Sequence, residues 1–309
     1  MNAPRPVAIV GPTATGKSDL AVQLALTAGG EVINADAMQL YRGMDIGTAK
    51  LPAEQRHGVP HHLLDILDVT ETASVADYQR RARAVIEDVR RRGLVPILAG
   101  GSGLYLTAVL DELVFPGTDA GLRAALEAEL TRVGAAALHD RLAGLDPAAA
   151  AAILPGNGRR IVRALEVIEL TGRPFSAFLP RPGRPLHGAV LVGIDRDTAE
   201  LDRRIAVRVE QMFAGGFVDE VRRLLSLGLR EGRTASRALG YRQVTAALDG
   251  ECTLAEAASG TVAATRRFVR RQRSWFRRDA RVRWLDGGRP DLLAAVIHAV
   301  QAVGSTGAP

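Results

Sequence analysis

The sequence predicts an α/β protein in which helices flank a parallel sheet and a helical insertion interrupts the sheet-forming part. Short apolar runs rich in β-branched residues alternate with segments of helical periodicity in the N-terminal part of the chain. This alternation is typical of a parallel sheet with helices on both faces. A long Ala-, Leu- and Arg-rich stretch follows, with helical spacing and no strand pattern, before a strand pattern returns.

Apolar runs and helix boundaries define the expected elements. The helical pattern of 18–28 ends at Gly29-Gly30, and the helix 75–92 is expected to start at an N-cap, Ser74, and to stop at Gly93. The chain from residue 201 onward is expected to be mostly helical. The predicted strands, the last of them an edge strand, are 7–10, 31–35, 95–99, 189–194 and 282–285.

The composition changes sharply on either side of the Ala-rich stretch. It begins after Phe115-Pro116-Gly117 and ends at a Pro- and Arg-rich joint over 180–185. We therefore expect a core made of 1–117 and 186–309, and a helical insertion domain over 118–185, a length within the usual domain range.

Charge and cysteine content limit the possible partners. The chain has 40 Lys and Arg against 34 Asp and Glu, and the excess is mostly arginine, whose planar fork suits phosphate oxygens. A single cysteine, Cys252, excludes a disulfide framework and a cysteine-based zinc site. We expect no signal peptide before the first strand, and no uncharged run in the sequence is long enough for a membrane span. We expect a cytoplasmic protein with no membrane association.

The first predicted strand leads into a phosphate-binding loop. The sequence Gly11-Pro12-Thr13-Ala14-Thr15-Gly16-Lys17-Ser18 matches G-x-x-x-x-G-K-[ST] at every fixed position, which predicts a P-loop NTPase-like core. Backbone N–H groups and the following helix would bind a di- or triphosphate, Lys17 would neutralise it, and the Ser18 hydroxyl would help to bind Mg²⁺. Taken alone, this loop indicates ATP.

The acid that usually accompanies such a loop is missing from the expected place. The strand 95–99 ends in Gly100-Gly101-Ser102 with no carboxylate, and we identify Asp36 as the only acid at a strand end near the loop. A carboxylate there lies at the ligand-binding edge of the sheet and could accept a proton from a nucleophile. The alternative is an aspartate that only caps a turn.

Longer motifs resemble one enzyme family. Asp36 lies within NADAMQLYRGMDIGTAK, and further segments read PHHLLD, GGSGLY, RALEV and GYRQ, in that order. Together they resemble the tRNA dimethylallyltransferase family, which moves the dimethylallyl group of dimethylallyl diphosphate to N6 of the adenosine at tRNA position 37. No zinc-finger extension is present, which suggests the bacterial type.

The resemblance implies roles for matching residues. Gly11 to Ser18 would bind the diphosphate with Mg²⁺, and Asp36 would bind the adenine amine and act as the general base. Ser102, where the family usually has Thr, would bond to the reacting site, and Arg208 would lie near the leaving group. Ala37 replaces a common Ser. Implied tRNA contacts of an expected monomer are Asp36, Ala37, Met38, Gln39, Ser102, Arg123, Arg159, Arg160, Arg163, Arg237, Gly240, Tyr241, Arg242, Arg270, Arg271, Arg273 and Arg277.

An arginine cluster from 266 to 283 supports an RNA partner. Arg266, Arg270, Arg273 and Arg277 share one helical face, and few acids near them in the sequence would neutralise them. The alternative is a solvated basic face. Phe268, Trp275 and Phe276, which are interspersed, are expected in the core.

Other interpretations remain open at this point. A small-molecule or nucleotide kinase would explain the P-loop and Asp36, and a non-catalytic RNA-binding protein would explain the arginines. His57, His61 and His62 lack cysteine partners, so we do not expect a metal site there.

Overall fold

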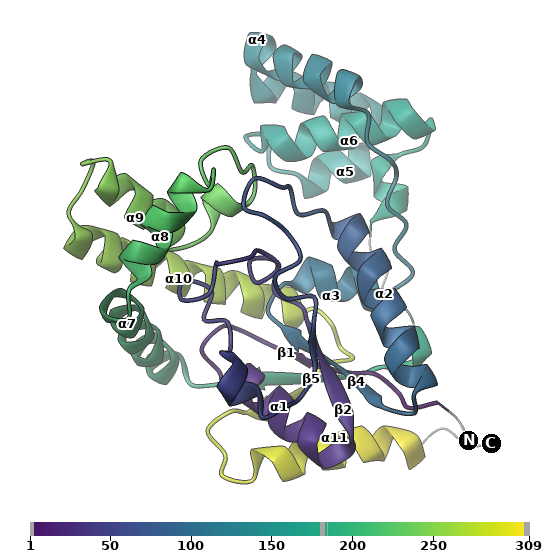
Figure 1. The fold of residues 1–309 in the computed structure, drawn as a ribbon. Coiled ribbons are helices and arrows are strands. Elements are labelled where there is room, and N and C mark those ends of the chain that lie inside the picture. The colour runs from purple at the N-terminus through teal and green to yellow at the C-terminus, as the bar shows by residue number, and fades with distance from the viewer. Residues whose placement is uncertain (1–2, 180–182, 184, 306–309) are drawn as a thin grey trace. The chain divides into compact units, whose positions relative to one another are not determined.

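A computed structural model describes residues 3–179, 183 and 185–305 of the chain (Figure 1). The structure divides into two compact units, Asp111–Gly183 and a larger one formed by Met1–Leu110 with Arg184–Pro309. The predicted joint over 180–185 lies mostly outside the described residues. The domain boundaries at 118 and 185 stay a prediction.

Six parallel strands make up the sheet of the larger unit within the described residues. They run in the order β3-β2-β4-β1-β5-β6, and every pairing is parallel. Their bounds are β1 Val7–Val10, β2 Gly30–Asn34, β3 His61–His62, β4 Val95–Gly100, β5 Val190–Asp195 and β6 Arg283–Asp286. The predicted fold class is confirmed, and so is the edge position of β6. Only β3 was missed, because its two histidines form no apolar run.

Both faces of the sheet are covered, as the fully apolar strands require. Val7 and Ile9 pack in a cluster with α1 (Lys17–Ala28) and α11 (Leu292–Ser305), which lie together in Figure 1. Ala8 and Val10 point the other way, into a cluster that includes α2 (Val75–Arg91) and α3 (Gly103–Leu110). Alternation along one strand thus supplies two cores.

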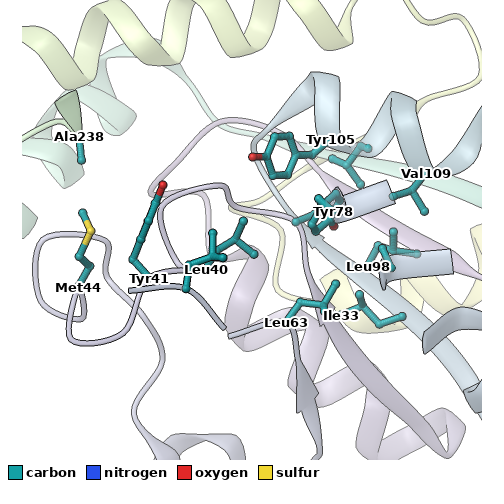
Figure 2. Close-up of a cluster of buried hydrophobic side chains, with 14 of the residues drawn as sticks. Ile33, Leu40, Tyr41, Met44, Leu63, Tyr78, Leu98, Tyr105, Val109 and Ala238 are labelled. Carbon is teal, nitrogen blue, oxygen red and sulfur yellow. The ribbon is translucent and has the colours of Figure 1, made fainter. Parts of the chain in front are cut away.

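The second of these cores supports the loop that follows β2. Figure 2 shows Tyr78 and Tyr105 beside Ile33 and Leu98 at the strand ends, with Leu40, Tyr41 and Met44 continuing the cluster. The rings of Tyr78 and Tyr105 lie 4.5 Å apart between centroids, and the Tyr41 hydroxyl donates to Glu71 O and accepts from Ala73 N. This packing fixes the position of the loop that follows β2.

Helices complete the larger unit after β5. They are α7 (Thr198–Ala214), α8 (Phe217–Ser226), α9 (Tyr241–Leu248) and α10 (Leu254–Phe276), and α10 packs against both α7 and α9. A capping box of Thr253 and Glu256 starts α10. No helix among the described residues is long and apolar enough to cross a membrane.

The smaller unit contains helices and no strand among its described residues, and it has its own core. It contains α4 (Ala120–Leu145), α5 (Pro147–Ala152) and α6 (Gly158–Thr171), capped by the side chains of Asp119, Asp146 and Asn157. Within α4, Gly134 has φ 82° and ψ 167°, which breaks the helix into two parts. Leu126, Leu138 and Ile161 are among the buried residues that join these helices.

Candidate active site

The P-loop connects β1 to α1 at the carboxyl edge of the sheet. Gly11 has φ 134°, and a Cβ there would lie 2.2 Å from the Ile194 carbonyl oxygen of the neighbouring strand. Gly16 is the left-handed N-cap of α1, with φ 96°. Both glycines of the motif are therefore required by the backbone path, and the loop opens its N–H groups at the start of the helix.

Lys17 is buried in this loop, with 9% of its surface exposed. Its ammonium donates to Pro12 O and lies 3.5 Å from Thr15 Oγ1. Burial, together with the charge of Arg208, lowers the pKa of Lys17 to about 7, against the opposing charges of Asp36 and Asp195. Because Lys17 binds its proton this weakly, a bound anion would strongly stabilise its charged form.

Three arginines donate hydrogen bonds to the P-loop. Arg196 Nε donates to Thr15 O at 3.3 Å, Arg204 Nε to Ala14 O at 2.8 Å, and Arg208 Nη1 to Thr13 Oγ1 at 3.4 Å. Burial lowers the pKa of Arg208, and Arg204 adds to this effect. The structure thus brings Arg208, which the sequence implied, to the loop. Arg196 and Arg204 were missed, although Arg204 lies one helical turn before Arg208.

Asp36 follows β2 in a turn that its neighbours define. Asn34 Oδ1 accepts from Asp36 N at 2.9 Å, and Asn34 Nδ2 donates to Asp36 O at 3.0 Å. The Tyr78 hydroxyl donates to Asn34 O at 2.8 Å, and the Asp36 carboxylate accepts from Met38 N at 3.0 Å. Burial raises the pKa of Asp36, while the Met38 N–H and the charge of Lys17 oppose that rise. A raised pKa makes this carboxylate a better proton acceptor.

Ser102 lies beside Asp36 because β2 and β4 are neighbouring strands. Its hydroxyl accepts from Ala37 N at 3.1 Å, and its own N–H donates to Ala35 O at 3.2 Å. The loops approach so closely that a Cβ at Gly100 would lie 2.2 Å from Ala35 O. Ser102 therefore contacts the Asp36 turn directly, and its predicted bond to the reacting site stays a prediction.

Two cavities meet at these residues. One, of about 340 Å³, is polar and extends from Gly16–Asp19 to Lys50–Gln55. The other, of about 360 Å³, has an apolar wall that includes Ile205, Val209 and Met212. Residues that line both cavities are Thr13, Ala14, Asp36, Thr48, Ala49 and Arg208. The site can therefore hold an anionic group on one side of Asp36 and an apolar or aromatic group on the other.

The statement that Asp36 is the only strand-end acid near the P-loop is wrong. Asp195 ends β5, which pairs with β1. Its carboxylate accepts from Arg273 Nε at 2.9 Å, from Arg273 Nη2 at 2.8 Å and from Arg277 Nη2 at 3.2 Å. The sequence places Asp195 directly after the predicted strand 189–194, but it does not show that this strand lies beside the one that leads into the P-loop.

The expected lack of neutralising acids on the arginine face is wrong for the same reason. Arg266 lies 3.5 Å from Asp202, while Arg273 and Arg277 bind Asp195. Of the four arginines on that face, only Arg270 has no such acid described here, and it is exposed. Acids on β5 and α7, which are far from these arginines in the sequence, supply the neutralising negative charge.

The remaining arginines implied in tRNA contact fall into two groups. Arg123 and Arg163, in the smaller unit, bind the buried carboxylate of Glu166, with Arg163 Nη1 at 2.8 Å. The exposed ones are Arg159, Arg160, Arg237, Arg242, Arg270 and Arg271. The second group has guanidinium groups at the surface.

The non-arginine residues of that set differ in exposure. Met38 and Gln39 each line one of the two cavities, whereas Tyr241 is buried and its hydroxyl donates to Glu220 Oε1 at 2.6 Å. Gly240 has φ 85°, and a Cβ there would meet Phe217 at 2.9 Å. Gly240 and Tyr241 therefore support the wall of the site and do not present polar side-chain groups to it.

The aromatic side chains of α10 behave differently from one another. Phe276 is buried, as predicted. Trp275 is 41% exposed, so its predicted core position is wrong: it packs over Gly103, where a Cβ would lie 2.2 Å from the indole. Phe268 is half-buried and lines the apolar cavity, with the Arg271 guanidinium 5.6 Å from its ring centroid.

The geometry agrees with comparisons to known proteins. A sequence model described as IPP transferase matches residues 39–279, most of the chain. This chain belongs to the IPP transferase family. The predicted family and the predicted enzyme class, a transferase, are thereby confirmed.

Individual members of the IPP transferase family align over nearly the whole chain. A tRNA dimethylallyltransferase of Saccharopolyspora erythraea is 66% identical and aligns with 96% of this chain and 95% of its own length. One of Salinispora tropica is 63% identical over 96% of this chain and 92% of its own. This similarity favours the prenyl-transfer interpretation over a kinase.

Solved structures of IPP transferases share the fold. The tRNA isopentenylpyrophosphate transferase of Bacillus halodurans is 41% identical, with a TM-score of 0.71 and 98% of both chains covered. A eukaryotic dimethylallyltransferase acting on tRNA has a TM-score of 0.82 at 25% identity, covering 99% of this chain and 81% of that one.

Two buried polar residues near the site gave no signal in the sequence. Gln272 on α10 bonds to Thr13 N and Gly101 O, and Glu220 on α8 accepts three backbone N–H groups of the loop 45–47. A helical-periodicity argument could have placed both on inner helix faces, but not beside these loops.

Proposed function

We propose that this protein transfers the dimethylallyl group of dimethylallyl diphosphate to N6 of the adenosine at tRNA position 37. The products are N6-isopentenyladenosine and diphosphate. One observation carries the proposal: Asp36 and Arg208 line both the polar cavity beside the P-loop and the cavity with the apolar wall. Asp36, as the general base, and Arg208, as a cation, thus lie where the two cavities meet. The anionic leaving group would occupy the polar cavity and the adenine the other.

The P-loop side suits a departing diphosphate. Cleavage of the carbon–oxygen bond in an allylic diphosphate spreads positive charge over the allyl group and puts negative charge on the leaving group. Preorganised donors that face developing charge usually give the largest catalytic effect. Here these are the loop N–H groups, Lys17 and Arg208, and the two cations are held in place by hydrogen bonds to Pro12 O and Thr13 Oγ1.

Mg²⁺ fits the donors at this end of the cavity. Ser18 has an exposed hydroxyl, and Asp19 beside it adds a carboxylate to the cavity lining. Mg²⁺ commonly binds one or two protein oxygens and takes its other ligands from substrate phosphates and water. When bound, it would add positive charge to the diphosphate. Ser18 is the residue we assign to it.

Asp36 and Ser102 serve the acceptor. The carboxylate of Asp36 would accept the proton that leaves the adenine amine when the new carbon–nitrogen bond forms. Such a base contributes about 10²–10⁴-fold. Ser102 holds the Ala37 N–H and can turn its own hydrogen toward the reacting group, since its oxygen is the acceptor in that contact.

The nucleic acid itself would be held by the exposed arginines. Extruding the adenosine from its loop costs a few kcal/mol, by analogy with base flipping, and phosphate contacts can offset that cost. We assign Arg159, Arg160, Arg237, Arg242, Arg270 and Arg271 to such contacts, all of them exposed. We further propose that the protein acts as a monomer in the cytoplasm.

Product analysis tests the proposal directly. Unmodified tRNA is incubated with the protein, Mg²⁺ and dimethylallyl diphosphate, then digested to nucleosides for mass spectrometry. The expected product is N6-isopentenyladenosine at position 37. A parallel incubation with ATP separates the kinase alternative: ATP consumption without prenylated adenosine would overturn the assignment.

A further inference from the structure

Gln272 is a buried amide at the meeting point of the two loops that form the site. It lies on α10, has 4% of its surface exposed, and lines the polar cavity. A long polar side chain seldom occupies such a position unless both ends of its amide are bonded. Both are bonded here, each to a backbone group of a different loop.

The two hydrogen bonds fix the orientation of the amide. Gln272 Oε1 accepts from the Thr13 N–H at 3.0 Å, and Gln272 Nε2 donates to Gly101 O at 3.0 Å. Flipping the amide would set two donors face to face and two acceptors face to face, so only this arrangement satisfies all four groups. A Cβ at residue 101 would lie 2.1 Å from Nε2, so a side chain there would displace the Gln272 amide.

These bonds link the leaving-group side of the site to the acceptor side. Thr13 belongs to the P-loop and also contacts Arg208. Gly101 immediately precedes Ser102, whose hydroxyl accepts from Ala37 N, next to Asp36. A continuous path of short contacts therefore runs from Thr13 through Gln272 and Ser102 to the Asp36 turn.

We propose that Gln272 is a positioning residue that couples the diphosphate-binding loop to the Ser102–Asp36 pair. It sets the distance between the group that leaves and the base that accepts the proton. Its catalytic consequence rests on the proposed function, whereas the coupling between the two loops does not.

The coupling is tested without turnover by hydrogen–deuterium exchange at the Ala37 N–H. Inorganic pyrophosphate with Mg²⁺ serves as the probe in the wild-type protein and in Gln272→Leu. In the wild type, pyrophosphate should slow exchange at Ala37 as well as in the P-loop. In the variant, the slowing should be confined to the P-loop. Equal protection of Ala37 in both proteins, or none in the wild type, would overturn the coupling.

The catalytic consequence is tested by single-turnover rates at saturating tRNA and donor. Because small displacements of reacting groups are costly, Gln272→Leu should transfer the dimethylallyl group roughly 10- to 100-fold more slowly. Its tRNA affinity should stay within about threefold of the wild type. An unchanged rate would overturn the positioning role. Absence of isopentenyladenosine from the wild type would instead refute the proposed function, and the exchange experiment would still decide the coupling.

A matched variant separates positioning from loss of stability. Phe276 lies on the same helix, is 4% exposed, and packs in the main core away from the cavities. Phe276→Leu should lower the melting temperature without changing the Ala37 protection or the transfer rate. If Phe276→Leu slows transfer as much as Gln272→Leu at equal destabilisation, the effect is structural and the proposal fails.

Discussion

The guanidinium of Arg273 on α10 binds the carboxylate of Asp195 at the end of β5 through two nitrogens, Nε at 2.9 Å and Nη2 at 2.8 Å. The same guanidinium donates to Thr198 Oγ1 and Arg196 O. The side chains of Arg273 and Asp195 are 12% and 16% exposed. Arg271, two residues earlier, is exposed and stacks near Phe268. Neighbouring arginines on one helix thus have different environments, and this difference gives the first prediction.

Arg273→Ala should lower the free energy of unfolding and leave the salt dependence of tRNA binding nearly unchanged. Removing Arg273 leaves the largely buried Asp195 with the exposed Arg277, at 3.2 Å, as its remaining arginine partner among the described residues, and costs up to about 3 kcal/mol in free energy of unfolding. Arg271→Ala should do the reverse, leaving stability within about 0.5 kcal/mol and reducing the salt slope by about 1. Denaturant unfolding and tRNA binding at several salt concentrations measure both. A large loss of salt slope in Arg273→Ala, with full stability, would assign it to RNA instead.

Asp36→Asn should slow prenyl transfer by about 10²–10⁴-fold, because the amide keeps an oxygen for the Met38 N–H but cannot accept the proton. Affinity for tRNA should change little. Single-turnover kinetics and a binding assay measure the two effects. Asp68→Asn, an exposed acid paired with Arg42, is the control and should behave as wild type. Wild-type turnover in Asp36→Asn would remove Asp36 as the base.

Pyrophosphate binding at pH 8 should be accompanied by proton uptake at Lys17. Burial and Arg208 lower the pKa of Lys17 to about 7 in the empty site, so its amine is mostly neutral at pH 8. The bound anion raises that pKa, and up to about one proton is taken up. Calorimetry in buffers of different ionisation enthalpy measures the number. Lys17→Met removes this contribution, and the difference between the two proteins excludes protons taken up by pyrophosphate itself.

Lys17 also makes the stability of the empty protein depend on pH. Its folded-state pKa of about 7 lies below the ordinary 10.5, so the unfolded chain binds the proton more tightly. The contribution of Lys17 to the free energy of unfolding should therefore rise as the pH increases from about 7 to about 10. The wild type minus Lys17→Met difference in denaturant unfolding measures that rise. A difference that does not change with pH would show that burial does not disfavour the charged ammonium form of Lys17.

Glu220 should be essential for holding the loop 45–47. Its Oε2 accepts from Asp45 N at 3.1 Å and Ile46 N at 2.7 Å, and its Oε1 accepts from Gly47 N at 3.2 Å and from the Tyr241 hydroxyl. Tyr241→Phe removes one hydrogen bond to a charged group and should cost about 1.5–3 kcal/mol in free energy of unfolding. Glu220→Ala should cost more, because it also removes the carboxylate that accepts the N–H groups of Asp45, Ile46 and Gly47. Equal losses in the two variants would contradict this order.

Much of the architecture follows from local patterns. Val7–Val10 and Val95–Gly100 are short, continuous apolar runs beside glycine turns, a pattern that favours buried strands. Ser74 accepts from Asp77 N as an N-cap should, and Gly29 ends α1 in a left-handed conformation. These features depend on residues a few positions apart, which is why the sequence predicted them.

The P-loop was predictable for the same reason. Gly11, Gly16, Lys17 and Ser18 form one contiguous motif whose backbone requirements are met within the segment. Asp36 and Ser102 were placed at strand ends correctly, because parallel strands bring their carboxyl ends to one edge.

The sequence by itself therefore determined the parallel α/β core, the P-loop and the two strand-end residues Asp36 and Ser102, since each depends on short-range backbone preferences. Only the tertiary structure decided which arginines are neutralised by Asp195 and Asp202, that Trp275 lies at the surface, and that Gln272 joins Thr13 to Gly101. The physical reason is that charge pairing and burial depend on the groups that meet in space. Those groups come from α10, β5, α7 and the two loops, which are far apart along the chain.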